Sequence, residues 1–132
     1  MTSVFAWYRN HALPVTPINP SPKTTAVLGV PTVASVRALL PVGSEGGPGP
    51  AATSVSFVTP PAVTRTVLAE ATAAGVRRVW MQPGSWDAEC VRFARDECAL
   101  EAVVYGHEAE LGYEGACVLV HGEMGLRAAG RL

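Results

Sequence analysis

Short apolar runs alternate with helical segments through the middle of the chain. Residues 54–58 (SVSFV), 77–82 (RRVWMQ) and 101–105 (EAVVY) have the length and the β-branched content of buried strands. Two segments with apolar residues at helical spacing, 61–74 and 86–99, separate these runs. A strand, helix, strand, helix, strand order favours β-α-β units with right-handed crossovers. The alternation therefore predicts an α/β fold, with a parallel sheet and flanking helices.

The two central helices have recognisable beginnings and ends. Thr59 to Pro61 can provide a cap and the first positions of the first helix, and Gly75 is a natural stop. We expect Ser85 to cap the second helix, whose first turn carries Asp87 and Glu89 beside the positive end of the helix dipole. The residues expected to face the core are Val63, Val67, Leu68 and Ala71 in the first helix, and Cys90, Phe93 and Ala94 in the second.

The first third of the chain is less regular. Residues 3–12 have the spacing of an amphipathic helix, and 14–19 predict a short strand because two prolines remove backbone donors. Residues 32–40 can form a helix with Val33, Val36, Leu39 and Leu40 on one side. The Gly and Pro content of residues 41–54 predicts a flexible internal loop. This loop is not expected to be a domain boundary, because too little chain lies on either side of it to form two hydrophobic cores. We therefore expect residues 1–132 to form a single domain.

Composition restricts the classes of partner. The formal net charge of −1, with acids and bases interspersed, gives no large surface for nucleic acid, and no apolar stretch is long enough to span a membrane. Three cysteines without a C-x-x-C pair indicate reduced thiols and a cytoplasmic protein. The first 44 residues lack Asp and Glu, as transit peptides do, but their prolines and patterned segments favour part of a folded domain.

Three turns are the expected ligand site. In an open parallel sheet, ligands bind beyond the carboxyl ends of the strands. The turns at Asn19 to Lys23, Thr59 to Pro61 and Gln82 to Ser85 are rich in proline or glycine, and each leads towards a helix. We expect them to line one crevice.

The motifs at these turns resemble a known family. They are PVTPINP at 14–20 followed by LGVPTV at 28–33, SVSFVTPP at 54–61, a helix that ends AAGV at 73–76, and VWMQPG at 79–84. In this order and spacing they are similar to the CoA-binding domain family, the Rossmann-like module also found at the N-terminus of the succinyl-CoA ligase alpha subunit. The resemblance covers residues 14 to about 100.

The resemblance implies that the adenosine diphosphate end of CoA lies over the strand ends while the pantetheine arm extends away. By position it implies three groups of cofactor-binding residues, one at each turn: Asn19, Pro20 and Lys23; Thr59, Pro60 and Pro61; Met81, Gln82, Pro83 and Gly84. The acidic residue that ligase subunits carry at the Gln82-Pro83 turn is absent, as is their phosphohistidine domain. Ligase catalysis is therefore not implied.

The sequence also departs from the family at its start. The family begins with a strand and a Gly-rich turn that approaches the pyrophosphate, whereas this sequence opens inside what resembles the first helix. We therefore expect a domain that lacks its first strand and Gly-rich loop, so that two neighbouring strands have no ladder partner. Such a chain could be a binding-incompetent fragment that self-associates, or pairs with another chain, through its open sheet.

The residues distinguish between nucleotides independently of the family. A dinucleotide fold that binds NAD usually places Asp or Glu after the second strand to accept ribose hydroxyl hydrogen bonds. Here Asn19 and Pro20 take that place, with Lys23 close behind. A lysine suits a phosphorylated ribose, as in CoA, although a lysine after a turn is also a common solvated residue.

Other candidate sites are weaker. Cys117 and His121 are four residues apart and could ligate a metal or act as thiolate and base, but two ligands without a third do not make a zinc site. CVLV at 117–120 can be strand or helix. Trp7 and Trp80 are predicted to cover core surfaces, and Trp86 to stack on an adenine at the crevice. Because nucleotide-hydrolase, esterase and metalloprotease motifs are missing, we expect non-catalytic binding, with no catalytic or metal-binding residue.

Overall fold

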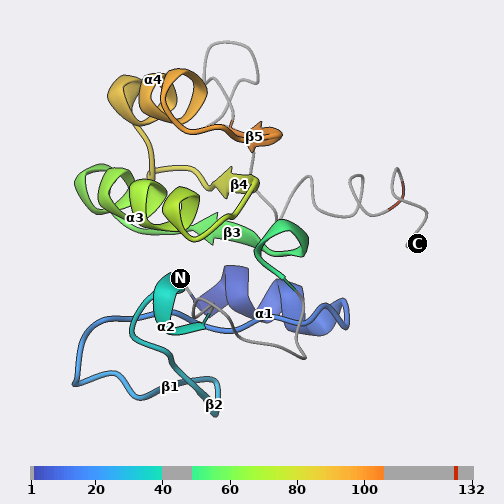
Figure 1. Ribbon diagram of the computed structural model, residues 1–132. Helices are drawn as coiled ribbons and strands as arrows, with labels where there is room; N and C mark the ends of the chain where they lie inside the picture. Colours follow the sequence, from blue (N-terminus) through green and yellow to red (C-terminus); the bar gives the residue numbers. More distant parts are fainter. Residues whose placement is uncertain (1, 40–48, 106–126, 128–132) are drawn as a thin grey trace.

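A computed structural model describes residues 2–39, 49–105 and 127 of the 132-residue chain. Figure 1 shows the order of its elements: α1 (Thr2–Asn10), β1 (Ala26–Val27), β2 (Val30–Pro31), α2 (Val36–Leu39), the 3₁₀ helix η1 (Pro50–Ala52), β3 (Ser54–Phe57), α3 (Pro61–Ala73), β4 (Arg78–Met81), α4 (Ala88–Asp96) and β5 (Ala102–Val104). None of the helices in these ranges is both long enough and apolar enough to span a bilayer.

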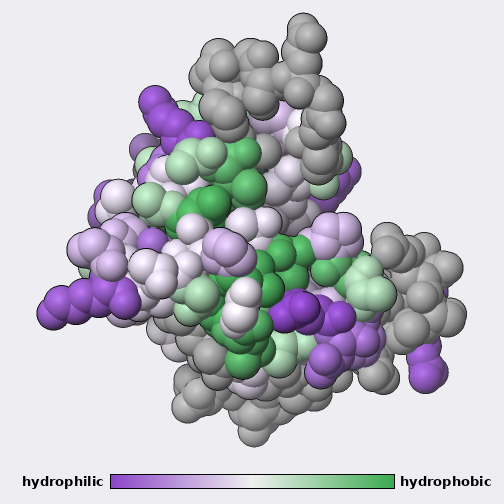
Figure 2. Space-filling view, turned by 90° about the horizontal axis from the view of Figure 1, so that it is seen from below, coloured by the Kyte–Doolittle hydropathy of each residue, from purple (hydrophilic) through white to green (hydrophobic). Residues whose placement is uncertain are grey.

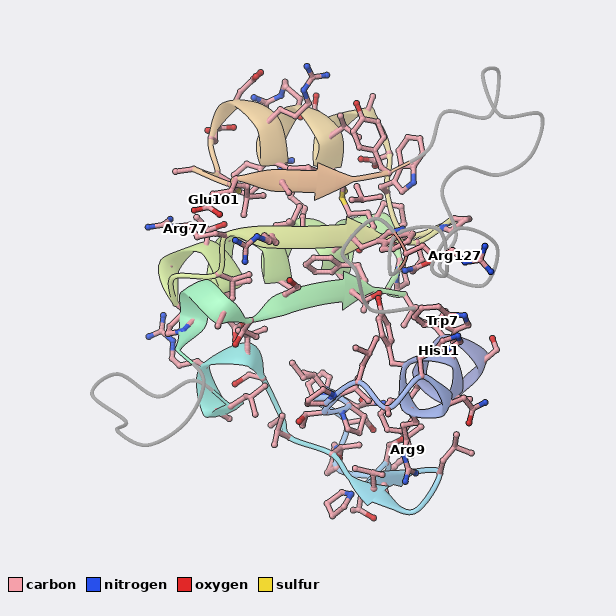
Figure 3. The ribbon with its side chains drawn as sticks, turned by 90° about the vertical axis from the view of Figure 1, so that its right-hand side faces the viewer. Trp7, Arg9, His11, Arg77, Glu101 and Arg127 are labelled. Atoms are coloured by element: carbon pink, nitrogen blue, oxygen red, sulfur yellow. The ribbon has the colours of Figure 1, made fainter. Side chains whose placement is uncertain are left out.

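The central feature is a three-stranded sheet in the order β3-β4-β5, with both pairs parallel. Ser54 is opposite Arg78 and Phe57 is opposite Met81, so β3 and β4 are in register along their whole length. Helices α3 and α4 connect the strands and lie behind the sheet in Figure 3. The predicted α/β fold, Rossmann-like with a parallel sheet and flanking helices, is confirmed.

The core lies between one face of the sheet and these two helices. Because side chains alternate along a strand, Phe57, Val79 and Met81 point to the helices while Ser56 and Trp80 point to the opposite face. The buried apolar cluster consists of Val36, Phe57, Leu68, Ala71, Val76, Val79, Met81, Cys90, Ala94 and Cys98.

The inner face of α3 differs from the prediction at one position. Leu68 and Ala71 are buried as expected, but the side chain of Val63 is 43% exposed and that of Thr64 is fully buried. Positions 64, 68 and 71 follow the i, i+4, i+7 spacing of one helical stripe, and Val63 lies outside it. The prediction for Val63 is therefore wrong. In α4 the predicted Cys90 and Ala94 are buried, and Phe93 is half-buried against the core.

The predicted stop of α3 is confirmed, but the predicted cap of α4 is wrong. Gly75 follows the last residues of α3 with a φ of +96°, a conformation that glycine adopts without strain. The cap of α4 is Asp87, whose carboxylate accepts a hydrogen bond from the Cys90 backbone N–H at 2.9 Å. Ser85 belongs instead to the turn after β4, where its hydroxyl donates to the Gln82 carbonyl at 2.7 Å.

The N-terminal part forms less regular structure than predicted. The expected strand at 14–19 is reduced to one parallel bridge between Ile18 and Val33. Val33 was expected in a helix over 32–40, but only Val36–Leu39 is helical. The backbone of Val33 is instead hydrogen-bonded to the backbones of Pro17 and Asn19. Leu40 and most of the predicted 41–54 loop lie outside the described residues.

Helix α1 and the β1–β2 hairpin lie below β3 in Figure 1. Figure 2, viewed from below, shows hydrophobic residues gathered near the middle of this surface with hydrophilic residues beside them. Leu28, at the hairpin tip, is 55% exposed, and its carbonyl accepts a hydrogen bond from Arg9 at 3.3 Å. Trp7 and Trp80, which were predicted to cover core surfaces, are half-buried.

Candidate functional site

Two of the three predicted turns lie together at one end of the sheet. Since β3 and β4 are adjacent and parallel, the turns that follow them, Thr59–Pro61 and Gln82–Ser85, occupy the same rim. The Gln82 backbone N–H donates to the Phe57 carbonyl at 3.0 Å, which extends the ladder to the start of the second turn. The structure therefore brings these two turns together.

The third predicted turn is tied to a different partner. Asn19 donates from its backbone to the Val33 carbonyl at 2.9 Å, and its side-chain oxygen accepts the Ser21 backbone N–H at 2.9 Å. Lys23 and Pro20 are exposed. Among the described residues, no hydrogen bond joins this turn to the turns after β3 and β4. The proximity of Asn19, Pro20 and Lys23 to the rim therefore stays a prediction.

The turn after β4 is preformed. Pro83 and Gly84 occupy its centre, the Ser85 backbone N–H donates to the Gln82 carbonyl at 3.0 Å, and Gly84 has a φ of +85°. Proline followed by a residue with positive φ is typical of a type II turn. A Cβ added to Gly84 would meet no described atom within 4 Å, so the outer side of this turn is open.

Two predicted site residues lie beneath the turn. Met81 is fully buried in the core, and Gln82 is only 2% exposed. The Gln82 amide donates to the Ser56 hydroxyl at 2.9 Å, and that hydroxyl also hydrogen-bonds with Tyr8. Burial raises the pKa of the Tyr8 phenol, and the Ser56 hydrogen bond opposes this shift. Met81 and Gln82 therefore support the turn from below.

The turn after β3 opens onto a helix end without a side-chain cap. The Thr59 hydroxyl is hydrogen-bonded to the buried Thr64 hydroxyl at 2.7 Å, so it does not cap α3. Pro60 takes the cap position and Pro61 the first helical position, and the Ala62 backbone N–H has no acceptor among the described residues. The free Ala62 N–H and the helix dipole favour an anion at this end of α3.

The corresponding end of α4 is already occupied by a negative charge. Asp87 accepts the Cys90 backbone N–H, and this hydrogen bond lowers the pKa of the Asp87 carboxyl. An anionic ligand is therefore disfavoured at α4 and favoured at α3. Sequence reasoning missed this difference, although Asp87 two positions after Ser85 was the available signal.

The aromatic side chains contact one another, and the stacking of Trp86 on an adenine stays a prediction. Trp86 packs against the core and against Tyr105, with ring centroids 5.3 Å apart and the planes at 68°. Trp7 and His11 stack at 3.9 Å, and Figure 3 shows both towards the end of the sheet where the strand arrows point. An aromatic pair from α1 was not predicted at this end of the molecule.

No metal site is formed by the described residues. Across residues 2–39, 49–105 and 127 there is no group of three or more His, Cys, Asp or Glu that could hold a metal ion. Burial raises the pKa of the Cys90 thiol, which donates to the Pro61 carbonyl at 3.2 Å. Cys117, His121 and the 117–120 run lie outside the described residues.

Two solved structures are similar to this fold. One is a conserved hypothetical protein from Pyrococcus furiosus, with a TM-score of 0.60 and 28% identity, covering 76% of this chain and 77% of that one. The other is a hypothetical protein from Pyrococcus horikoshii OT3, with a TM-score of 0.59 and 26% identity, covering 77% of this chain. The chain spans 63% of the second protein, which is less than two thirds of its length.

Comparison by sequence gives a family. No curated protein matches the chain. The pattern of the CoA binding domain family matches residues 2–122, which include α1, the three-stranded sheet and both turns at its rim. With its fold, its preformed rim and this match, the chain belongs to the CoA binding domain family.

Proposed function

We propose that the chain binds coenzyme A or a related adenine nucleotide at the carboxyl ends of β3 and β4, without catalysing a reaction on it. The observation that carries this proposal is the pair of preformed turns on adjacent parallel strands, one of which opens onto the uncapped end of α3. Family membership supports CoA binding in general. The free thiols of Cys90 and Cys98 fit the cytoplasmic location that we propose.

In this proposal the rim residues differ in their roles. Thr59, Pro60 and Pro61 line one side of the ligand, and Pro83 and Gly84 line the other. A ligand phosphate accepts the Ala62 N–H at the start of α3, where the helix dipole favours negative charge. Met81 holds the second turn in place from the core side, and Gln82 holds it from the face that carries Ser56.

The turn at Asn19 to Lys23 distinguishes CoA from NAD in this proposal. Lys23 is the only lysine of the chain, and its ammonium group suits the 3′-phosphate on the ribose of CoA. NAD lacks this phosphate and normally needs a carboxylate at the corresponding place. Asn19 and Pro20 offer no such carboxylate.

A thermal shift series tests the proposal. The folded protein is titrated with CoA, with 3′-dephospho-CoA and with NAD, and we expect CoA to stabilise it most. Lys23→Ala should remove the difference between CoA and dephospho-CoA, whereas Arg37→Ala, which removes an exposed base of α2, should keep it. Stabilisation by NAD that equals or exceeds that by CoA would refute the ribose argument.

The non-catalytic part of the proposal has its own test. Acetyl-CoA incubated with the protein should release free thiol no faster than in buffer, as measured with a thiol reagent after the protein is removed. Turnover that disappears in Cys117→Ser would instead indicate an acyl-transfer enzyme.

A second candidate function is association with another chain through the open sheet, either as self-association or with a different protein. The outer edge of β3 favours it, because β3 is an end strand of the described sheet. This candidate predicts association that depends on concentration and no response to CoA. Sedimentation measured with and without CoA distinguishes the two candidates.

A further inference from the structure

A groove lies beside strand β5, on the side of the sheet that α4 covers. Its volume is about 430 Å³, it is open to solvent along one side, and it is lined by Ala94, Arg95, Leu100, Glu101, Val103 and Tyr105. Val103 is opposite Val79 of the core, so its side chain turns towards the helices, and Figures 1 and 3 both show α4 over β5. Sites for small molecules have volumes of about 300–1,000 Å³, so this β5 groove is large enough for one.

The floor of the β5 groove is apolar. Ala94 belongs to the buried core cluster, and Leu100 and Val103 pack against that cluster while they remain partly exposed. A ligand that covers these two side chains removes apolar area from water, which is favourable. The floor therefore favours an aliphatic occupant.

The charged residues of the groove lining already have partners. Arg95 donates to the Tyr105 hydroxyl at 3.4 Å, and the Glu101 carboxylate forms an ion pair with Arg78 at 3.1 Å. A charged group brought into the groove would have to compete with one of these contacts, whereas an uncharged chain leaves both in place. The lining therefore suits an uncharged aliphatic chain better than an ion.

One end of the β5 groove lies at the rim that holds the two preformed turns. Tyr105 follows the carboxyl end of β5, and because β5 is parallel to β4, this end lies on the same rim as the turn at Gln82–Ser85. The Tyr105 ring contacts Trp86, the residue after that turn, with ring centroids 5.3 Å apart. Leu100 and Glu101 precede β5, so the groove follows the strand away from the rim for about 13 Å, at about 3.3 Å a residue.

The strand order also relates the groove to the proposed CoA site. In that proposal a phosphate lies at the Ala62 N–H after β3, and Pro83 and Gly84 line the ligand after β4. Adjacent strands are about 4.8 Å apart, so in the order β3-β4-β5 the end of β5 lies roughly 10 Å from the end of β3. This distance is shorter than the extended pantetheine arm of CoA. An arm that crosses the rim from β3 to β5 therefore brings its sulfur to the mouth of the β5 groove.

From this arrangement we propose that the preferred ligand is an acyl-CoA whose uncharged, unbranched acyl chain of medium length lies in the β5 groove. The inference rests on the proposed function and names the class of CoA compound that the rim receives. The nucleotide and the arm follow the strand order, and the acyl chain then runs along β5 over the apolar floor. In this arrangement Trp86 contacts the thioester end of the ligand and not its adenine.

A series of CoA compounds tests the proposal on the unmodified protein. Isothermal titration calorimetry gives the dissociation constants of CoA, acetyl-CoA and hexanoyl-CoA. Because the groove is open along one side, about half of each added methylene is buried, and hexanoyl-CoA should bind about ten- to thirtyfold more tightly than acetyl-CoA. Equal dissociation constants for these two thioesters overturn the proposal.

A thioester with a charged chain end tests the character of the groove. Adipoyl-CoA has the same chain length as hexanoyl-CoA but ends in a carboxylate, which would meet Glu101 at the far end of the groove. We expect it to bind no more tightly than acetyl-CoA. Binding as tight as that of hexanoyl-CoA would show that the chain end stays in water, and would overturn the placement in the groove.

Two variants at neighbouring positions of β5 locate the acyl chain. Val103→Thr places a hydroxyl in the groove with little change of shape, and Val104→Thr makes the same change on the opposite face, where Val104 is 39% exposed. The preference for hexanoyl-CoA over acetyl-CoA should fall by about three- to tenfold in Val103→Thr and stay unchanged in Val104→Thr. Circular dichroism and the thermal midpoint establish that both variants are folded.

The outcomes separate this inference from the proposed function. If no CoA compound binds, the proposed function fails and the acyl-CoA preference fails with it. If CoA and its thioesters all bind equally, CoA binding stands and only the acyl-chain site fails. If hexanoyl-CoA is preferred equally in Val103→Thr and Val104→Thr, another surface receives the chain and the β5 groove is the wrong site.

Discussion

The Gln82 side chain donates to the Ser56 hydroxyl at 2.9 Å, across the ends of two adjacent strands. Gln82 also begins the turn that carries Pro83 and Gly84, and Ser56 hydrogen-bonds with Tyr8 of α1. The rim of the sheet, strand β3 and helix α1 are therefore coupled through two hydroxyls and one amide. Removal of the central hydroxyl should affect all three.

We predict that Ser56→Ala destabilises the protein by about 1–3 kcal/mol, because it leaves the buried Gln82 amide and the Tyr8 hydroxyl with one partner fewer. Ser54→Ala is the matched control, since Ser54 lies on the same strand and is exposed. Urea denaturation followed by tryptophan fluorescence gives both values. Equal midpoints for the two variants would show that the Ser56 network adds no stability.

Tyr8 predicts a dependence on alkaline pH. Burial raises its pKa above the value of 10.0 in the unfolded chain. Between the unfolded and folded pKa values the native state holds the phenol proton and the unfolded state does not, so the free energy of unfolding falls as pH rises. We expect this loss above about pH 10 in the wild type and a smaller one in Tyr8→Phe. Parallel pH profiles of the two proteins would contradict the assignment.

The turn after β4 predicts a backbone effect at Gly84. Its φ of +85° disfavours any side chain, although an added Cβ would meet no described atom. Gly84→Ala should therefore destabilise by about 1–2 kcal/mol through backbone strain alone. Gly49→Ala also enters open space, but Gly49 has a φ of −69°, so it should be close to neutral or slightly stabilising. Comparable losses in both variants would argue against a strained turn.

The parallel sheet was predictable because its strands and helices follow one another at fixed spacing. The apolar runs around Phe57, Val79 and Val103 each form a strand, and the glycine at 75 ends a helix as its lack of Cβ suggests. These are local signals. Each depends only on residues that are close in the sequence.

The parts that sequence reasoning missed depend on distant partners. Val33 was expected in a helix, but its backbone pairs with Pro17 and Asn19, a contact that no local pattern announces. The hydrogen bond from the Gln82 side chain to Ser56, 26 positions away, has no signal in the neighbouring sequence, and a contact between Gln82 and a ligand stays a prediction. The sequence alone therefore could not show which residues of the rim are buried and which are exposed.

The last prediction concerns the cap of α4. Hydrogen bonds from Cys90 lower the pKa of the Asp87 carboxyl from its ordinary value of 3.8. The stabilisation by its charge is therefore complete above the unfolded pKa and is lost as the pH falls through the lower folded pKa. Asp87→Asn keeps a side-chain acceptor but carries no charge beside the helix end. At neutral pH we expect the variant to melt below the wild type, with a difference that shrinks towards pH 3 as the wild-type carboxylate takes up its proton. Because the same change removes the negative charge that disfavours a phosphate at α4, CoA should also stabilise Asp87→Asn at least as much as the wild type. A difference in melting temperature that stays constant from neutral to acid pH would mean that the carboxylate charge does not stabilise α4.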